Sequence, residues 1–199
     1  SSLVVANGGI RTHPGSDRRK LNLDSMDASL AYFNIRTNEL ERLVRLPNKK
    51  ASIRHLAVVK DQKVIIGVQD QGLLHKSYPL AFIDEGISEL KALDTPSFIL
   101  QKLKGYTSSL AVDAMGELGV VTAPRGNIVL AYDLKSRDIK HHFRLRDVSG
   151  VTYDVERDMF FLTTGLGRLF EFDGVSAPTE IKNLSRSTRI YWDNHLSSA

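Results

Sequence analysis

Short apolar runs separated by polar turn residues recur along this chain. The clearest set lies between residues 108 and 145, where the apolar runs are 110–112, 118–122, 128–132 and 139–145. Runs of this length, each bounded by turn residues, are typical of β-strands rather than helices. The segment therefore predicts one four-stranded antiparallel meander.

The same pattern repeats on both sides of this segment. The blocks 53–93 and 149–184 align with it through LAVVKDQKVIIG, LAVDAMGELGVVT and VTYDVERDMFFLT, each of which reads as strand, tight turn and strand. A third strand follows in every block and ends in an aspartate, namely Asp84, Asp133 and Asp173. An Asp carboxylate accepts hydrogen bonds from backbone N–H groups where a turn begins. We therefore expect these three residues to cap the turns that follow them.

A repeat of roughly 40 residues with four strands is typical of a β-propeller blade. One blade cannot bury both of its faces, so neighbouring blades stack around a common axis. A β-sandwich also has short strands and regular turns, but three blocks in register favour the propeller. We predict an all-β propeller with about four four-stranded antiparallel blades in this chain. Residues 1–199 form either one complete domain or the C-terminal part of a larger ring.

The predicted blade segments are 2–47, 53–94, 107–146 and 149–186, with a closing strand at 190–196. The first segment opens with a strand at 3–6 that resembles the second strand of a blade, and a hairpin at 29–34 and 39–46 follows. Residues 96–104 break the pattern and predict a short helix closed by Gly105. Two arrangements stay open. Strand 190–196 closes a four-bladed ring, or the chain is half of a larger ring with exposed faces that favour self-association.

Composition narrows the function classes. The chain has 199 residues, 42% of them hydrophobic, which is enough for a sizeable core. The formal net charge is only +4. The sequence shows no large basic face interleaved with aromatic residues, which argues against a nucleic-acid partner. The absence of cysteine excludes disulfides and thiolate metal sites. No apolar run is long enough for a transmembrane helix, and the start at Ser1 without a signal peptide predicts a processed chain or a fragment.

A long polar loop at 9–28 is the first candidate site. Loops of this length without regular structure are often functional. Glycines at its start allow close backbone approach to a ligand, an arginine fork binds carboxylate or phosphate, and a histidine can act as ligand or acid–base group near neutral pH. The alternative is a loop held by its own hydrogen bonds. The candidate residues here are Asn7, Gly8, Gly9, Arg11, Thr12 and His13.

A second group of candidates lies on predicted inner strands, which line the central channel of a propeller. We expect their polar side chains to converge with the long loop on one channel mouth, which would bind a ligand. The alternative is that these side chains pin the ring closure through hydrogen bonds to neighbouring strands. The candidates are Arg54, His55, Trp192, Asp193, Asn194 and His195, joined by Arg125 from a tight turn.

Catalytic and metal motifs are weak. A metal site could recruit His13, His55, Asp193 and His195, but their spacing matches no metal motif, and no G-x-S-x-G elbow is present. We therefore assign no catalytic or metal residues and no cofactor. His141 and His142 are expected on an outer strand, pointing to the interblade face and to solvent, and His75 in a loop is assigned no role.

Several stretches resemble the C-terminal half of the bacterial family called domain of unknown function 1513. They are LVVANGGIRTHP (3–14), KLNLDSM (20–26), SIRHLAV (52–58), PRG (124–126), TGLGRL (164–169) and WDNHL (192–196). The resemblance implies a seven-bladed propeller of the YVTN and quinoprotein-amine-dehydrogenase-like type, exported to the periplasm, with genes that often neighbour imelysin-like, iron-related proteins. The N-terminal half and export signal of that family are not in this sequence, which favours a fragment.

Two functions follow from these observations. The first is a non-enzymatic periplasmic binding or scaffold propeller that holds a partner protein or a small anionic ligand at the channel mouth, with a link to iron-related systems. The alternative is an enzyme of the lactonase or amine-dehydrogenase type that carries a metal or a partner-held cofactor at the same place.

Overall fold

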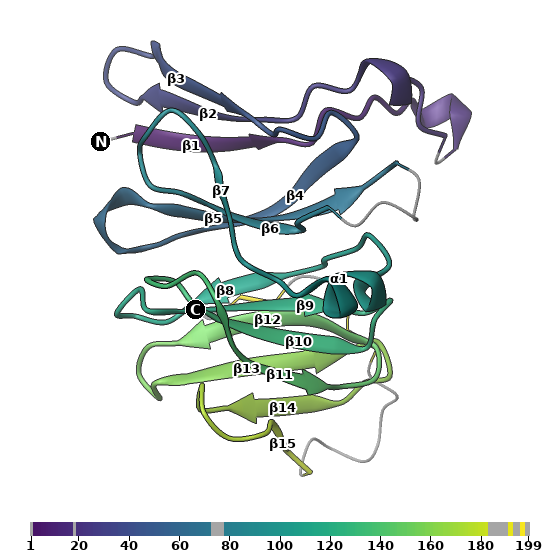
Figure 1. The fold of residues 1–199 in the computed structure, drawn as a ribbon, viewed down its shortest axis with the longest axis vertical. Coiled ribbons are helices and arrows are strands. Elements are labelled where there is room, and N and C mark those ends of the chain that lie inside the picture. Colours follow the sequence, from purple (N-terminus) through teal and green to yellow (C-terminus); the bar gives the residue numbers. More distant parts are fainter. Residues whose placement is uncertain (1, 18, 73–77, 183–190, 193–195, 198–199) are drawn as a thin grey trace.

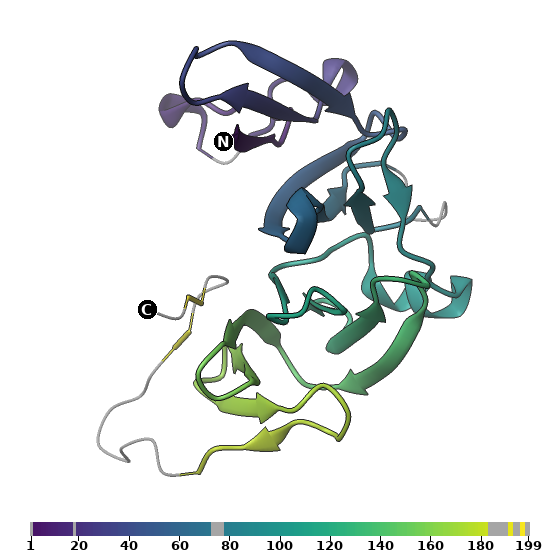
Figure 2. The same cartoon turned by 90° about the vertical axis from the view of Figure 1, so that its left-hand side faces the viewer.

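The computed structural model describes the chain apart from residues 1, 18, 73–77, 183–190, 193–195 and 198–199. The described residues form four antiparallel sheets in which consecutive strands pair side by side (Figure 1). The sheets follow one another along an arc (Figure 2), and the described residues do not close the arc into a ring. The predicted all-β propeller is therefore confirmed, in the form of an open part of a ring.

The four sheets follow one another along the chain. The first contains β1 (Ser2–Asn7), β2 (Ser29–Asn34) and β3 (Leu40–Arg45). The second contains β4 (Ala51–Val58), β5 (Val64–Asp70), β6 (Ala81–Asp84) and β7 (Lys91–Ala92). The third contains β8 (Leu110–Val112), β9 (Leu118–Ala123), β10 (Ile128–Asp133) and β11 (Ile139–Arg144). The fourth contains β12 (Val148–Asp154), β13 (Met159–Thr164), β14 (Leu169–Phe172) and β15 (Thr179–Glu180).

The helical elements are short. Helix α1 (Ser97–Leu103) confirms the predicted helix, and it ends with Lys104 in the left-handed conformation before Gly105 at φ 65°. The 3-10 helices η1 (Pro14–Ser16) and η2 (Leu23–Ser25) lie in the long loop, and η3 (Lys60–Gln62) joins β4 to β5. In the described part of the chain, no helix is long and apolar enough to span a membrane.

The predicted aspartate caps are confirmed. Asp133 Oδ1 accepts the backbone N–H groups of Lys135 and Ser136 at 3.0 and 2.8 Å, and Asp173 caps its own turn in the same way. Asp84 Oδ1 accepts the N–H of Gly86 at 3.0 Å. Asn34 makes the equivalent bonds at the end of β2, so β2 corresponds to the third strand of a blade and β1 to the second.

Apolar side chains between consecutive sheets form two core clusters. One spans the first three sheets and helix α1, and the other joins the third sheet to the fourth. Buried hydroxyl groups add polar ties across the same interfaces. These bonds run from Ser52 Oγ to the Gly8 carbonyl (2.7 Å), from Thr107 Oγ1 to the Val68 carbonyl (2.8 Å) and from Thr122 Oγ1 to the Ser149 carbonyl (2.6 Å).

The first sheet has an apolar face that no other described sheet covers. Strand pairing places Leu3, Val5, Leu40 and Leu43 on the side opposite to Tyr32 and Arg42, and 39–52% of each of these four apolar residues is exposed. Strand β1 also pairs on one edge only within the described chain. The predicted closing strand stays a prediction, because residues 191–192 and 196 have no strand assignment and 190 and 193–195 lie outside the described residues.

Candidate functional site

The connections between strands divide the molecule into two ends. The pairs Asn7↔Ser29 and Ala51↔Asp70, with the hydrogen bond from Ser52 Oγ to the Gly8 carbonyl, show that the long loop and the start of β4 lie at the same end. We call this end, on the right in Figure 1, the loop end. It comprises residues 8–17, 19–28, 46–50, 71–72, 78–80, 95–109, 124–127, 145–147 and 165–168. The opposite turn end comprises 35–39, 59–63, 85–90, 113–117, 134–138, 155–158 and 173–178.

Charge is distributed unequally between these two ends. At the loop end, basic residues outnumber acidic ones: Arg11, Arg19, Lys20, Lys49, Lys50, Lys102, Lys104, Arg125, Arg146 and Arg168 against Asp17, Asp24, Asp27 and Asp147. At the turn end the balance reverses: Glu39, Asp61, Glu85, Glu89, Asp113, Glu117, Asp138, Glu156, Asp158 and Asp173 against Arg36, Lys60, Lys63, Lys135, Arg137 and Arg157. A summed field of this kind attracts anions to the loop end.

The long loop is braced by its asparagines. Asn7 Oδ1 accepts the Gly9 N–H at 3.0 Å and its Nδ2 donates to the Asp27 carbonyl at 3.2 Å, which closes the base of the loop. Asn22 accepts the Arg11 N–H at 2.6 Å and donates to the Gly9 carbonyl at 2.9 Å. Gly9 has φ 69°, and a Cβ there would lie 2.7 Å from the Ala28 nitrogen, so only glycine fits.

Arg11 and His13 are two of the loop side chains that can meet a ligand. Both residues are exposed, and among the described residues the Arg11 guanidinium has no ion-pair partner. His13 Nδ1 accepts the Gly15 N–H at 3.0 Å, which orients the imidazole ring. The loop is anchored to the second sheet by Lys50, whose Nζ donates to the Leu23 carbonyl at 2.6 Å and lies 2.8 Å from Asp24 Oδ1.

Arg54 lies beside the base of this loop. A bulge in β4 between Ile53 and His55 leaves Arg54 exposed, and its Nη1 lies 3.9 Å from the position of a Cβ on Gly8. Its Nε donates to Gln69 Oε1 at 3.3 Å. His55 is half-buried on the same strand. The structure therefore brings Arg54 next to the start of the loop.

Arg125 lies at the loop end in the turn 124–127. Its guanidinium carbon lies 4.3 Å from the centre of the Tyr106 ring, a cation–π contact that holds the side chain while leaving the residue exposed. The turn packs against helix α1, because a Cβ on Gly126 would lie 2.7 Å from the Lys102 carbonyl oxygen. Arg125 thus belongs to the same end of the molecule as Arg11.

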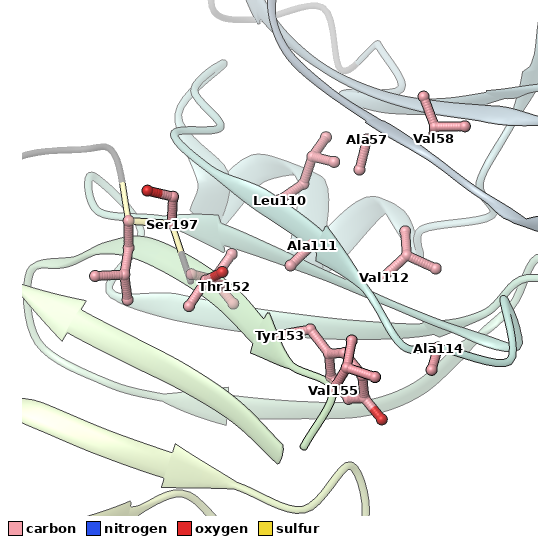
Figure 3. Close-up of a pocket in the computed structure, with 12 residues that line it drawn as sticks. Ala57, Val58, Leu110, Ala111, Val112, Ala114, Thr152, Tyr153, Val155 and Ser197 are labelled. Atoms are coloured by element: carbon pink, nitrogen blue, oxygen red, sulfur yellow. The ribbon is translucent and has the colours of Figure 1, made fainter. Parts of the chain in front are cut away.

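The inner strands line a hollow with both apolar and polar surface. The hollow, of about 320 Å³, lies along β4, β8 and β12, lined by small and branched side chains such as Ala57, Ala111 and Val112 (Figure 3). Leu196 and Ser197 also line it. Trp192 is half-buried, and its indole Nε1 has no hydrogen-bond partner within the described chain. Asp193, Asn194 and His195 lie outside the described residues.

No group of three or more His, Asp or Glu side chains that could hold a metal ion occurs in the described part of the chain. Of the four residues in the metal hypothesis, His13 and His55 are described and the other two are not. The expected alternation of His141 and His142 is confirmed, since His142 is exposed and His141 stacks on Phe143 with ring centres 6.1 Å apart.

An ionic cluster between the first two sheets escaped the sequence analysis. The buried carboxylate of Asp84 receives both terminal nitrogens of Arg42, at 3.1 and 2.6 Å, and a short hydrogen bond from the Tyr32 hydroxyl. Burial opposes ionisation of Asp84, but the hydrogen bonds from Arg42, Tyr32 and the Gly86 N–H outweigh it and lower its pKa. Burial and the neighbouring carboxylate raise the pKa of Tyr32. The apolar context of Asp84, in LAFIDEG, was the only signal that pointed to its burial.

Comparison with known proteins agrees with the fold. No curated protein matches the chain in sequence. The C-terminal WD40 domain of Sif2 is a structural relative with a TM-score of 0.57 and 15% sequence identity, and the alignment covers 90% of this chain and 44% of that one. The chain thus spans less than half the length of this relative, and the likeness concerns the fold alone. The sequence profile described as "Protein of unknown function (DUF1513)" matches residues 1–199, so the protein belongs to the DUF1513 family.

Proposed function

We propose that this protein is a non-enzymatic binding propeller whose loop end holds an anionic group of a partner protein or a small ligand. The observation that carries the proposal is the segregation of charge between the two ends of the molecule. Arg11 and Arg125 are exposed at the basic loop end, and Arg54 is exposed on β4 beside the base of the long loop. A guanidinium binds carboxylate or phosphate through parallel hydrogen bonds, so these three are the contacts we expect.

The framework supports such a role. The asparagine bonds within the long loop and the Ser52–Gly8 tie hold the binding elements in place before a ligand arrives. Preorganisation lowers the entropy lost on binding. The excess positive charge at the loop end raises the rate at which anions reach it, and this effect weakens as salt is added.

The resemblance to exported propellers extends the proposal to a periplasmic location, a seven-bladed complete ring and a link to iron-related periplasmic proteins. Fractionation of cells that express the epitope-tagged full-length gene product tests the location. Recovery with cytoplasmic markers would contradict it. The candidates Asn7, His13, His55, Trp192, Asp193, Asn194 and His195 remain predicted members of the channel-mouth site.

Titration calorimetry with citrate and inorganic phosphate as probes tests the binding function. We expect the triple variant Arg11→Ala, Arg54→Ala and Arg125→Ala to weaken binding of the bound probe about tenfold or more, equivalent to about 1.4 kcal/mol. The matched control is Arg36→Ala, Lys135→Ala and Arg157→Ala, which removes three arginine or lysine side chains from the turn end. Equal affinity in both variants, with unchanged melting temperatures, would refute the role of the loop end.

A further inference from the structure

A second basic groove lies between helix α1 and the outer strand β11. It has a volume of about 380 Å³, and its lining includes Lys102 from the helix, Asn127 from a turn, and His142 and Arg144 from the strand. Ile128 and Phe143 supply apolar surface within it. The turn 124–127 sits directly against the helix, so the walls of the groove are held together by packing.

The two residues with a formal charge that line this groove, Lys102 and Arg144, are both positive. Its lining contains no acidic residue. Within the described residues no ion pair is formed by Lys102, His142 or Arg144. The Lys102 Nζ lies 5.7 Å from the centre of the Phe98 ring. Asp147, which follows Arg144 by three positions, instead faces Gly165 in the turn between β13 and β14, where its Oδ2 is the nearest atom to the position of a Cβ. The groove therefore has an unneutralised positive potential above a partly apolar floor.

Strand β11 is also an edge strand, since it ends the order β11-β10-β9-β8. Its start is already covered, because Asp94 bridges Asp138 and donates its N–H to the Arg137 carbonyl at 2.7 Å. The part of the edge that an incoming strand could use is therefore 140–144.

The exposed residues of β11 alternate as Lys140, His142 and Arg144, while Ile139, His141 and Phe143 are half-buried. An edge strand has backbone N–H and C=O groups that can pair with an incoming strand. Strand β3 also lies at a sheet edge, but its charge differs from that of β11, because β3 carries both an acidic residue, Glu41, and a basic one, Arg45.

We propose that this groove and the edge of β11 together bind an extended acidic segment of a partner protein. The segment would add a strand to the third sheet, and its alternate carboxylates would meet Lys102, His142 and Arg144. Addition of a strand to a sheet edge derives affinity from main-chain hydrogen bonds and specificity from side-chain pockets. Lysine and arginine on an edge also repel basic or identical strands, so the same residues that prevent self-pairing select an acidic partner.

Fluorescence anisotropy on the full chain tests this proposal. The probe is a fluorescein-labelled peptide of about eight residues that alternates valine and glutamate, the length of an ordinary strand. We expect it to bind and the matching valine–lysine peptide not to bind. The double variant Lys102→Glu and Arg144→Glu should weaken binding at least about tenfold. The control variant Arg36→Glu and Lys135→Glu, which reverses two exposed charges at the turn end, should leave it within about twofold.

Hydrogen exchange supplies the second readout, because strand addition slows exchange of the outward-facing β11 amides. Absence of binding, or equal binding by the double variant, would overturn the proposal. Competition by inorganic phosphate without protection of β11 would show a small-anion site and would also overturn it. The triple variant of Arg11, Arg54 and Arg125 should still bind the acidic peptide. The proposal for this groove and the proposal for the loop-end site can therefore be refuted independently.

Discussion

The interface between the first and second sheets differs in chemistry from the interface between the third and fourth. In the first interface, Arg42 and Tyr32 converge on the buried carboxylate of Asp84, with Arg42 stacked 4.1 Å from the Tyr32 ring centre. In the second, Phe143 packs edge-on against Phe172 with ring centres 5.4 Å apart. One blade contact is therefore largely ionic at its turn end, and the other is aromatic.

The two interfaces therefore depend on different quantities. The aromatic contact depends on the apolar area that is buried, and the ionic contact depends on how its groups are oriented. Buried aromatic rings contribute through apolar burial and edge-to-face geometry, and they tolerate small shifts between sheets. A buried charge is stabilised only when its partners hold the right positions, and removal of one partner leaves an uncompensated charge. We infer that the ionic contact sets how the first sheet meets the second and makes that contact sensitive to pH.

Loss of an aromatic ring should have the largest effect. Phe172 is 1% exposed, and Phe172→Ala leaves a cavity between the third and fourth sheets, so we expect the free energy of unfolding to fall by about 3–5 kcal/mol. Urea denaturation followed by circular dichroism measures this loss. Phe161→Ala is the control, because Phe161 is only half-buried. An equal loss in both variants would argue against the aromatic contact as the main contribution.

Removal of the buried carboxylate should have the next largest effect. Asp84→Ala leaves Arg42 and the Tyr32 hydroxyl without their shared acceptor, and we expect destabilisation of about 3 kcal/mol. Asp133→Ala is the matched control, since Asp133 also caps a turn but has no Arg partner. A loss confined to about 1 kcal/mol in both would show that only the cap matters.

Acid should weaken the ionic interface through Asp84. Its pKa is lowered in the folded protein, so its contribution to stability is complete above the unfolded-state pKa of about 3.9 and is lost as pH falls through the lower folded-state pKa. We expect the stability advantage of the wild type over Asp84→Asn to shrink as pH falls from about 5 to about 2. A constant advantage across this range would contradict ionisation of Asp84 as its source.

Loss of one interblade hydroxyl should have the smallest effect. Thr122 Oγ1 is fully buried and donates to the Ser149 carbonyl, so Thr122→Val leaves that carbonyl without this donor and should cost about 1–2 kcal/mol. Thr12→Val on the exposed loop is the control and should change the melting temperature little. An unchanged stability of the Thr122 variant would show that this hydroxyl contributes nothing to the contact between the third and fourth sheets.

The candidate site was only partly predictable from sequence. The long loop, its glycines and the cations Arg11 and Arg54 can be recognised as candidates in the sequence. The repeat predicts that Arg54 lies near the loop once the strand order is known. Asn22, which braces the loop, and Lys102, which faces Arg144 across the groove, carry no local signal. Their roles arise from contacts that no short window of sequence contains.

The sequence by itself determined the elements. Alternating apolar residues, tight turns and strand-end aspartates recur with one period. Each of these features depends on neighbours a few positions away. Local chemistry therefore predicts the strands, the Asp133 and Asp173 caps, helix α1 and the propeller class. Only the tertiary structure decided which sheet faces meet. Arg42 reaches Asp84 across 42 positions and Thr122 reaches Ser149 across 27, because stacking of the sheets around an arc brings distant residues together. The ionic interface, the basic groove and the separation of charge between the two ends all depend on that stacking.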